Sequence, residues 1–309
     1  MRTDKRVAFT FDDTPHDAGV FFTPDERTAT LVGQLADAGV EQAGFFVVVG
    51  DLQQPRGVGG EDRIRAYTAA GHVLGSHSYR HPRLEETSAE DFLADVDRAA
   101  GWFVGREGAR PWFRFPFLDE GDADPHKRTT VRKALAERGL QNAYVTVLTL
   151  DWYLDALVAQ TVREGRPYDR RALRDLYVES LLEPAEFYDR LAVAAIGRSP
   201  VHVVLLHEND LNTLFIADAA RAFRVAGWDI VPIDEAYRDP IASIEPEGWC
   251  GSGRVSALAL DSKKIRPGGL DLEVLETPVM LRSFERRVTA RQTAKGLPMK
   301  SSSAEGDSL

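Results

Sequence analysis

The chain has 309 residues, 43% of them hydrophobic, and a formal net charge of −10. It is long enough to bury a large core, and its single cysteine, Cys250, excludes an intrachain disulfide. The acidic balance argues against nucleic acid or an anionic membrane as the main partner, and no apolar run reaches the ~18 residues of a membrane span.

Apolar runs alternate with helical patterns from the N-terminus to about residue 240. The runs expected to be strands lie at 6–11, 44–49, 72–76, 112–115, 142–148, 201–207 and 228–232. Their near-continuous apolar character is typical of strands covered on both faces. Helices are expected between them, two of these within 169–197. Strict alternation predicts an α/β protein with a parallel sheet, closed into a (β/α)7 TIM-like barrel, or otherwise left as an open doubly wound sheet.

The ends of this pattern set the expected domain limits. Residues 1–240 are expected to form the barrel domain, and 241–288 a small C-terminal appendage of short strands and turns. The polar segment 289–309 is expected to be a disordered tail. The first apolar run ends in two aspartates and is not a signal sequence, which predicts a cytoplasmic protein, or one exported by a signal outside this sequence.

Polar residues follow five of the seven expected strands. Barrel enzymes build their sites from residues at the carboxyl ends of strands, so these residues are the candidates for chemistry. They are Asp12 and Asp13 after the first strand, His77 and His81 after the third, Arg114 at the fourth, Asp151 and Trp152 after the fifth, and His207 at the sixth.

His77 and His81 are four residues apart, so on a helical turn both imidazoles would share one face and reach one ion. The spacing resembles the zinc-protease helix, in which a glutamate follows the first histidine and acts as the general base. Ser78 stands at that position here, so a general base must come from elsewhere. Asp12 and Asp13 supply two carboxylates where the chain leaves a strand and turns. One can complete a metal shell and the other can act as base, and the charge of the metal makes the pair tolerable.

His207 is a candidate general acid, with Asp151 orienting its ring and Arg114 keeping the base ionised. The structural alternatives are a buried Arg–Asp pair and a core histidine. A two-histidine, one-carboxylate iron oxygenase is a further alternative, but the βα alternation argues against it.

Five motifs now occur in order: "TFDD", "HSYRH", "RFPF", "DW" and "LLH". Over roughly residues 5–240 the sequence resembles the polysaccharide deacetylase family (carbohydrate esterase family 4, NodB homology domain). The resemblance implies a distorted barrel of seven or eight strands. It also implies that Asp13, His77 and His81 bind a divalent metal, most often Zn²⁺, with Co²⁺, Ni²⁺ or Mn²⁺ as alternatives. Asp12 would be the general base and His207 the general acid.

The resemblance assigns supporting roles as well. Arg114 would tether the base and Asp151 would tune the acid. Trp152 and Leu205 would form the walls of the acetyl methyl pocket, and the backbone N–H of Phe117 would bind the oxyanion.

The function implied is hydrolysis of an N-acetyl, or less favoured O-acetyl, group on a carbohydrate, with metal-bound water attacking the acetyl carbon. The alternatives are a cytoplasmic cyclic-amide hydrolase of the allantoinase or imidase type on the same fold, and a non-catalytic carbohydrate-binding protein. The sequence does not specify the glycan, the oligomeric state or the role of the C-terminal extension.

Overall fold

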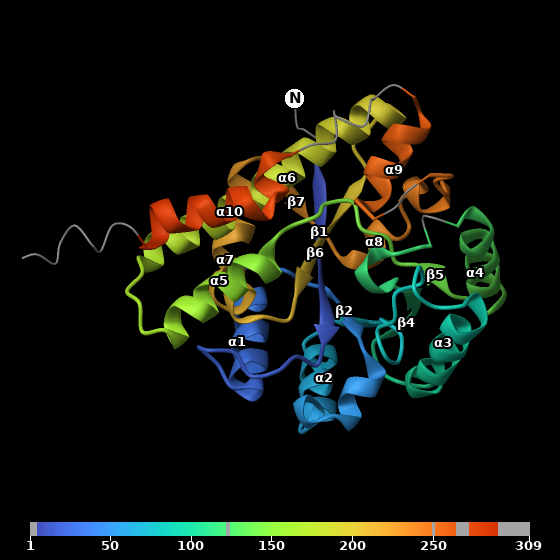
Figure 1. Ribbon diagram of the computed structural model, residues 1–309, viewed down its shortest axis with the longest axis horizontal. Helices are drawn as coiled ribbons and strands as arrows, with labels where there is room; N and C mark the ends of the chain where they lie inside the picture. Colours follow the sequence, from blue (N-terminus) through green and yellow to red (C-terminus); the bar gives the residue numbers. More distant parts are fainter. Residues whose placement is uncertain (1–4, 122–123, 249–250, 264–271, 290–309) are drawn as a thin grey trace, which may run out of the picture.

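A computed structural model of the chain describes residues 5–121, 124–248, 251–263 and 272–289 (Figure 1). Within these residues the strands form one parallel sheet in the order β5-β4-β3-β2-β1-β6, and β7 pairs with β1. The strands are β1 (Arg6–Thr14), β2 (Gly44–Val47), β3 (Val73–Ser76), β4 (Ala109–Phe113), β5 (Gln141–Asn142), β6 (Val201–His207) and β7 (Asp229–Ile230). The predicted parallel α/β architecture is therefore confirmed.

The sheet curls because the chain after β5 connects β4 to β6. The Ala143 N–H donates to the carbonyl of Phe113 on β4, over 2.8 Å. Farther along, Val147 bridges Val204 on β6, whose neighbour Leu205 donates to the Val147 carbonyl. Regular strand structure in this part of the chain is thus limited to β5, at 141–142. The rest of the expected strand 142–148 closes the barrel through irregular contacts, which agrees with the distorted barrel that the resemblance implies.

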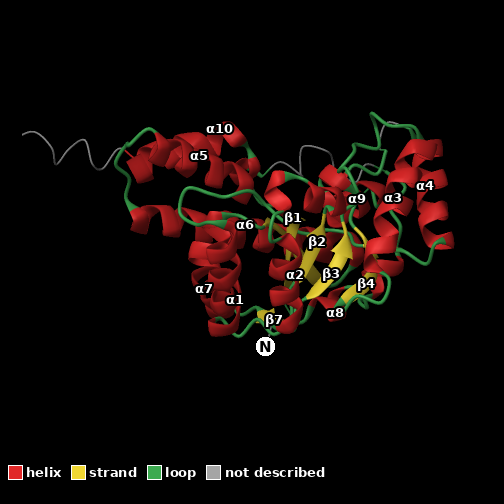
Figure 2. Cartoon of the chain, turned by 90° about the horizontal axis from the view of Figure 1, so that it is seen from below, coloured by secondary structure: helices red, strands yellow, loops and turns green. Residues whose placement is uncertain are grey.

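Helices cover the outside of the sheet, with α1 and α7 on one side and α3 and α4 on the other (Figures 1 and 2). The helix α1 begins after Thr23, whose hydroxyl accepts from the backbone of Glu26 in a reciprocal capping box. None of the helices in the described part of the chain has the length and apolar character needed to cross a bilayer. The helices up to α8 are α1 (Pro24–Asp37), α2 (Gly60–Ala69), α3 (Ala89–Phe103), α4 (Pro125–Glu137), α5 (Asp151–Arg163), α6 (Arg170–Ile196), α7 (Asp210–Val225) and α8 (Ile233–Ala236). Short helical turns are η1 (Val49–Gln53), η2 (Pro55–Gly57), η3 (Pro116–Leu118), η4 (Pro240–Ser243), η6 (Glu273–Leu275) and η7 (Glu285–Thr289).

The expectation of two helices within 169–197 is wrong, because α6 is one helix of 27 residues that contains Pro184. Proline costs a helix about 3 kcal/mol or more, since it removes a hydrogen bond and clashes with the preceding turn. Here the buried face continues on both sides, through Leu181 before the proline and Ala185 and Tyr188 after it. We infer that burial of this continuous face outweighs the cost.

The expectation of short strands within 241–288 is also wrong. The segment forms two further helices, α9 (Gly253–Asp261) and α10 (Thr277–Phe284). The first helix docks on the barrel-closing segment, where the Arg254 N–H donates to the Val145 carbonyl over 2.8 Å. Met280 and Phe284 bury α10 in the main core beside α5 and α6 (Figure 1). Cys250 and residues 290–309 of the expected disordered tail lie outside the described residues, whereas Thr289, where that tail was expected to begin, is the last residue of η7.

Candidate active site

One cavity of about 920 Å³ lies where the carboxyl ends of the strands meet the start of α5. Two of the predicted site residues, Arg114 and Asp151, lie one layer deeper and are fully buried. The other predicted site residues line the cavity directly: Asp12, Asp13, His77, His81, Phe117, Trp152, Leu205 and His207. Side chains far apart in the sequence are thus gathered in one place.

Asp12 and Asp13 both face this cavity because β1 is irregular there. In a regular strand, neighbouring side chains point to opposite faces. The pairing register of β1 shifts between Phe11 and Thr14, and Asp13 has a left-handed φ of 61°. Asp tolerates this conformation better than most residues. The carboxylates therefore lie inside the strand at an irregularity, and not beyond its end as the sequence suggested.

The side chains of Asp13, His77 and His81 converge on one point. The two Nε2 atoms are 3.1 Å apart, and Asp13 Oδ1 is 3.6 Å from His77 Nε2 and 3.3 Å from His81 Nε2. All three donor atoms lie within 4.8 Å of one another. The expected helical turn is absent from this stretch, which is a loop with positive φ at Ser78 and His81. A loop brings the two imidazoles together where we expected a helix face to do so.

The protonation states of this trio suit a divalent cation. Burial lowers the pKa of His77 and of His81 to about 4, so both imidazoles are neutral at pH 7. Burial works to raise the pKa of Asp13, but the histidines around it outweigh burial and hold the pKa below its ordinary value. His77 Nδ1 lies 2.9 Å from the carbonyl of Arg114, which orients the ring. Two neutral imidazoles and one carboxylate fit a zinc-type site.

Asp12 is held by a buried arginine. Arg114 Nη1 donates to both carboxylate oxygens, over 2.9 and 3.1 Å, and the arginine is fully buried. Burial raises the pKa of Asp12, and the charge of Arg114 offsets only part of that effect. Asp12 Oδ2 is also 3.7 Å from His77 Nε2, so the carboxylate borders the trio while its oxygens bind the guanidinium.

His207 and Asp151 form a second coupled pair. His207 Nδ1 lies 3.0 Å from Asp151 Oδ1, and the His207 backbone N–H donates to Oδ2 over 2.8 Å. Burial works to lower the pKa of His207, but the Asp151 carboxylate outweighs it and raises the pKa to about 9. The side-chain amides of Asn209 and Asn212 also donate to Asp151 Oδ2, over 3.0 and 2.7 Å. This amide support was not predicted from the sequence, although both residues closely follow His207.

The rim of the site contains strained and aromatic residues. Phe117 has a φ of 57°, and its ring packs 4.4 Å from that of His81. The guanidinium of Arg83 also lies 3.7 Å from the centre of the Phe117 ring. Trp152 is half-exposed at the start of α5. Arg83 was not identified from the sequence, although it lies only two positions after His81.

Several further lining residues were not predicted from the sequence: Arg163 on α5, Tyr188 on α6, and Leu272, Leu275 and Glu276 in the C-terminal segment. No local pattern marks them, because they reach the cavity only through tertiary packing.

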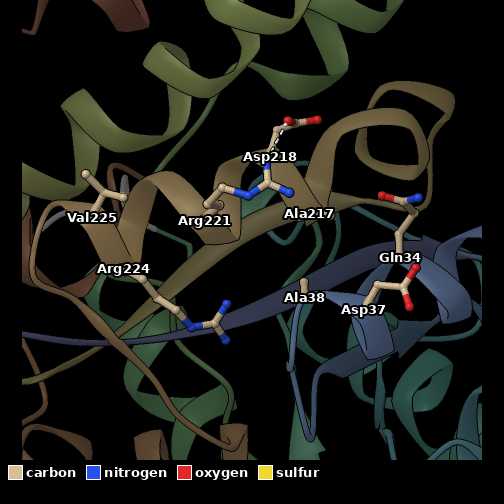
Figure 3. Close-up of a pocket in the computed structure, with 8 residues that line it drawn as sticks. All are labelled: Gln34, Asp37, Ala38, Ala217, Asp218, Arg221, Arg224 and Val225. Carbon is tan, nitrogen blue, oxygen red and sulfur yellow. Dashed lines mark hydrogen bonds and ion pairs between the residues drawn. The ribbon is translucent and has the colours of Figure 1, made fainter.

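A second hollow of about 490 Å³ lies on the outer surface between α1 and α7 (Figure 3). Arg221 on α7 pairs there with Asp218 over 3.0 Å. Its lining includes no histidine or cysteine, and it lies away from the strand ends. We therefore place the candidate active site in the larger cavity alone.

Comparison with known proteins identifies relatives of this chain. Residues 1–143 match the sequence profile of the polysaccharide deacetylase family. A chitin deacetylase from Colletotrichum lindemuthianum is 32% identical over 113 residues, which are 36% of this chain and 42% of that protein. The chain thus matches less than half the length of this curated relative. The matched profile includes the first three motifs and ends before Asp151 and His207, which the fold places beside them.

Two solved structures share the fold. A polysaccharide deacetylase from Bacillus cereus superimposes with a TM-score of 0.52 at 18% identity, covering 74% of this chain and 91% of the other. A peptidoglycan N-acetylglucosamine deacetylase gives 0.50 at 17% identity, covering 77% and 90%. At these identities the likeness establishes the fold alone.

The pair of Asp12 and Arg114 yields a stability prediction. Arg114→Met would leave the Asp12 carboxylate buried without its partner, so the free energy of unfolding should fall by about 3–5 kcal/mol in urea denaturation. Arg110→Met on β4, the strand that Arg114 directly follows, is the matched control. Its pair with Asp234 is partly exposed, at 33% and 17%, and should contribute about 1 kcal/mol or less. Equal losses in the two variants would contradict the central place of Arg114.

Proposed function

We propose that this chain, whose residues 1–143 match the polysaccharide deacetylase family, is a metal-dependent hydrolase that removes acetyl groups from a carbohydrate. N-acetyl groups are favoured over O-acetyl groups. The observation that supports this most is the trio of Asp13, His77 and His81, placed in one cavity with Asp12 and His207. A carboxylate and an imidazole beside a metal-binding trio can serve as the general base and the general acid in the hydrolysis of an amide.

The trio would hold the metal through Asp13 Oδ1 and the Nε2 atoms of His77 and His81. Zinc is the preferred ion because neutral imidazoles and a carboxylate are its common ligands, while Co²⁺, Ni²⁺ and Mn²⁺ accept the same donors. When bound, such an ion polarises a carbonyl and lowers the pKa of water from 15.7 to about 7.

Asp12 would accept the proton of the attacking water. The pKa of Asp12 is raised toward the operating pH, which makes the carboxylate a better general base. Arg114 fixes the orientation of this carboxylate and opposes its protonation at pH 7. The backbone N–H of Phe117 would donate to the oxygen that becomes negative during attack. In this proposal Arg114 is a positioning residue, because it acts through Asp12.

His207 would protonate the leaving nitrogen. With a pKa of about 9 it holds a proton at neutral pH, and Asp151 fixes the ring through Nδ1. Breaking the C–N bond then gives acetate and a free amine. Trp152 and Leu205 line the same cavity and would contact the acetyl methyl group.

The direct test is acetate release after chelation, measured with and without added zinc on N-acetylglucosamine oligomers and acetylated xylan. We expect release that depends on zinc, and a fall in kcat/KM of roughly 10²–10⁴-fold in Asp12→Asn and in His207→Ala. Asp62→Asn, whose side chain is 80% exposed, is the matched control and should retain activity. Ring opening of hydantoin or allantoin without acetate release would contradict the deacetylase assignment.

The pair of His207 and Asp151 predicts a pH effect. The proposed acid works while protonated, so kcat/KM should decline as pH rises through the His207 pKa of about 9. Asp151→Asn removes the charge that raises this pKa, and burial then lowers it. The decline should begin at lower pH, with kcat/KM at about pH 8 reduced by roughly 10² or more.

The control for this prediction is Asp189→Asn, which alters another His–Asp pair, formed with His202 at 3.3 Å outside the cavity. Its pH profile should match that of the unmodified protein. An unmoved alkaline limb in Asp151→Asn, with activity retained, would exclude His207 as the acid.

A further inference from the structure

The cavity continues well beyond the metal-binding trio, along one face of α5. The residues of α5 that line it are Trp152, Asp155, Ala156, Ala159 and Arg163, which lie on one side of the helix because they follow one another at helical spacing. From Trp152 to Arg163 the helix rises about 16 Å, at 1.5 Å per residue. The volume of about 920 Å³ lies near the upper end of small-molecule sites, which span roughly 300–1,000 Å³. The cavity is therefore elongated and larger than a single acetyl group needs.

The walls of this extension are largely apolar. Leu148 and Leu150 contribute from the segment before α5, and Tyr188 contributes from α6. Leu272 and Leu275 of the C-terminal segment also line it. A polar substrate would find few hydrogen-bond partners on such a surface. An apolar chain would instead remove this apolar surface, and its own, from water.

Most polar groups of the extension are already engaged or lie at its exposed end, and Ser252 adds one hydroxyl to the lining. The Asp155 carboxylate accepts the Leu211 N–H over 3.0 Å, and the Asn209 amide donates to Asp151. Arg163 and Glu276 are exposed. Along α5, Arg163 is the lining residue farthest from the trio, so the apolar stretch lies between a polar reaction centre and a charged mouth.

The C-terminal wall is fixed in place by the core. Leu272 and Leu275 lie in a tight turn, where the Leu275 N–H donates to the Leu272 carbonyl over 2.8 Å. The next helix, α10, packs against α5 and α6 through Met280 and Phe284, which are almost fully buried (Figures 1 and 2). Farther on, the Asp169 N–H before α6 donates to the carbonyl of Val288. The turn that carries the two leucines is thus held against the core by the packing of α10.

We propose that this apolar channel, lined by Leu148, Leu150, Ala156, Ala159, Leu272 and Leu275, binds the aliphatic chain of an N-acylated amino sugar. The enzyme would then cleave amides with acyl groups longer than acetyl. This inference rests on the proposed function. The water oxygen bonds to the acyl carbon, the C–N bond breaks and a proton passes to nitrogen, giving a fatty carboxylate and a free amine without redox chemistry.

The chain lies on the acyl side and not on the side of the leaving amine. Trp152 and Leu205, which flank the acyl group in the proposed function, lead directly into the channel. Trp152 is the first residue of the lining face of α5. The carbonyl of Leu205 accepts the Thr149 hydroxyl over 2.7 Å, which places it beside the channel residues on either side of Thr149.

The first experiment measures kcat/KM for the N-acetyl, N-butyryl, N-hexanoyl and N-octanoyl glucosamines with the zinc-loaded protein. We expect a gain of about four-fold per added methylene until the channel is full, the equivalent of ~0.8 kcal/mol per buried CH₂. Octyl N-acetylglucosaminide carries the same chain on the sugar and should show no such gain. A flat acyl series, or a gain confined to the octyl glycoside, would overturn the proposal.

Two channel variants test the location. Leu275→Asp puts a carboxylate into the wall, and Ala159→Trp fills the middle of the α5 face. Either should reduce the ratio of octanoyl to acetyl kcat/KM by at least about ten-fold. Gln160→Trp adds the same ring on the exposed face of α5 and is the matched control. An unchanged ratio in both channel variants would exclude this channel.

Carboxylate binding separates failure of the channel from failure of the proposed function, because it needs no turnover. By calorimetry, octanoate should bind at least about 10²-fold more tightly than acetate, and Leu275→Asp should abolish the difference. If no acylated sugar is hydrolysed but this difference holds, the proposed function fails and the acyl-chain channel stands. Equal binding of the two carboxylates would overturn the channel even in an active deacetylase.

Discussion

A buried arginine organises the site. Arg114 has no exposed surface, and each of its guanidinium nitrogens finds an acceptor: both oxygens of Asp12, the hydroxyl of Tyr237 and the carbonyl of Ala143. A buried charge is costly unless it is paired and hydrogen-bonded, so the arginine requires an ionised partner at the end of β1. Its own carbonyl orients the ring of His77. One residue thereby fixes both a carboxylate and an imidazole of the site.

This constraint explains why two adjacent aspartates lie near the end of the apolar strand β1. Arg114 binds Asp12, and the left-handed backbone at Asp13 turns the next carboxylate toward the histidines. The surroundings then move the two pKa values in opposite directions, upward for Asp12 and downward for Asp13. Neighbouring groups with opposite shifts are suited to different roles, one as a proton acceptor and one as a permanent anion. The second buried pair, of His207 and Asp151, supplies the opposite charge state, a histidine protonated at neutral pH.

Sequence patterns predicted those parts of the molecule that depend on local order. Near-continuous apolar runs marked the strands, and because parallel strands end at one edge, the polar residues after them could be grouped into one site. The loop geometry of His77 and His81 could not be predicted, since its left-handed residues are held by hydrogen bonds such as that from the His81 N–H to Ser78 Oγ. The helices at 253–261 and 277–284 were missed because short apolar stretches near glycine and proline fit either strand or helix. The approach of Leu272 and Leu275 to the cavity is a long-range contact with no local signal.

The central claim is that one of two adjacent carboxylates holds a metal while the other does not, and zinc affinity tests it most directly. We would titrate zinc into the unmodified protein, Asp13→Asn and Asp12→Asn, in competition with a chelator of known affinity. Both variants remove one negative charge and keep the side-chain shape, so each controls for the other. We predict that Asp13→Asn loses at least about 10²-fold more zinc affinity than Asp12→Asn does. An equal loss in the two variants, or a greater loss in Asp12→Asn, would contradict it.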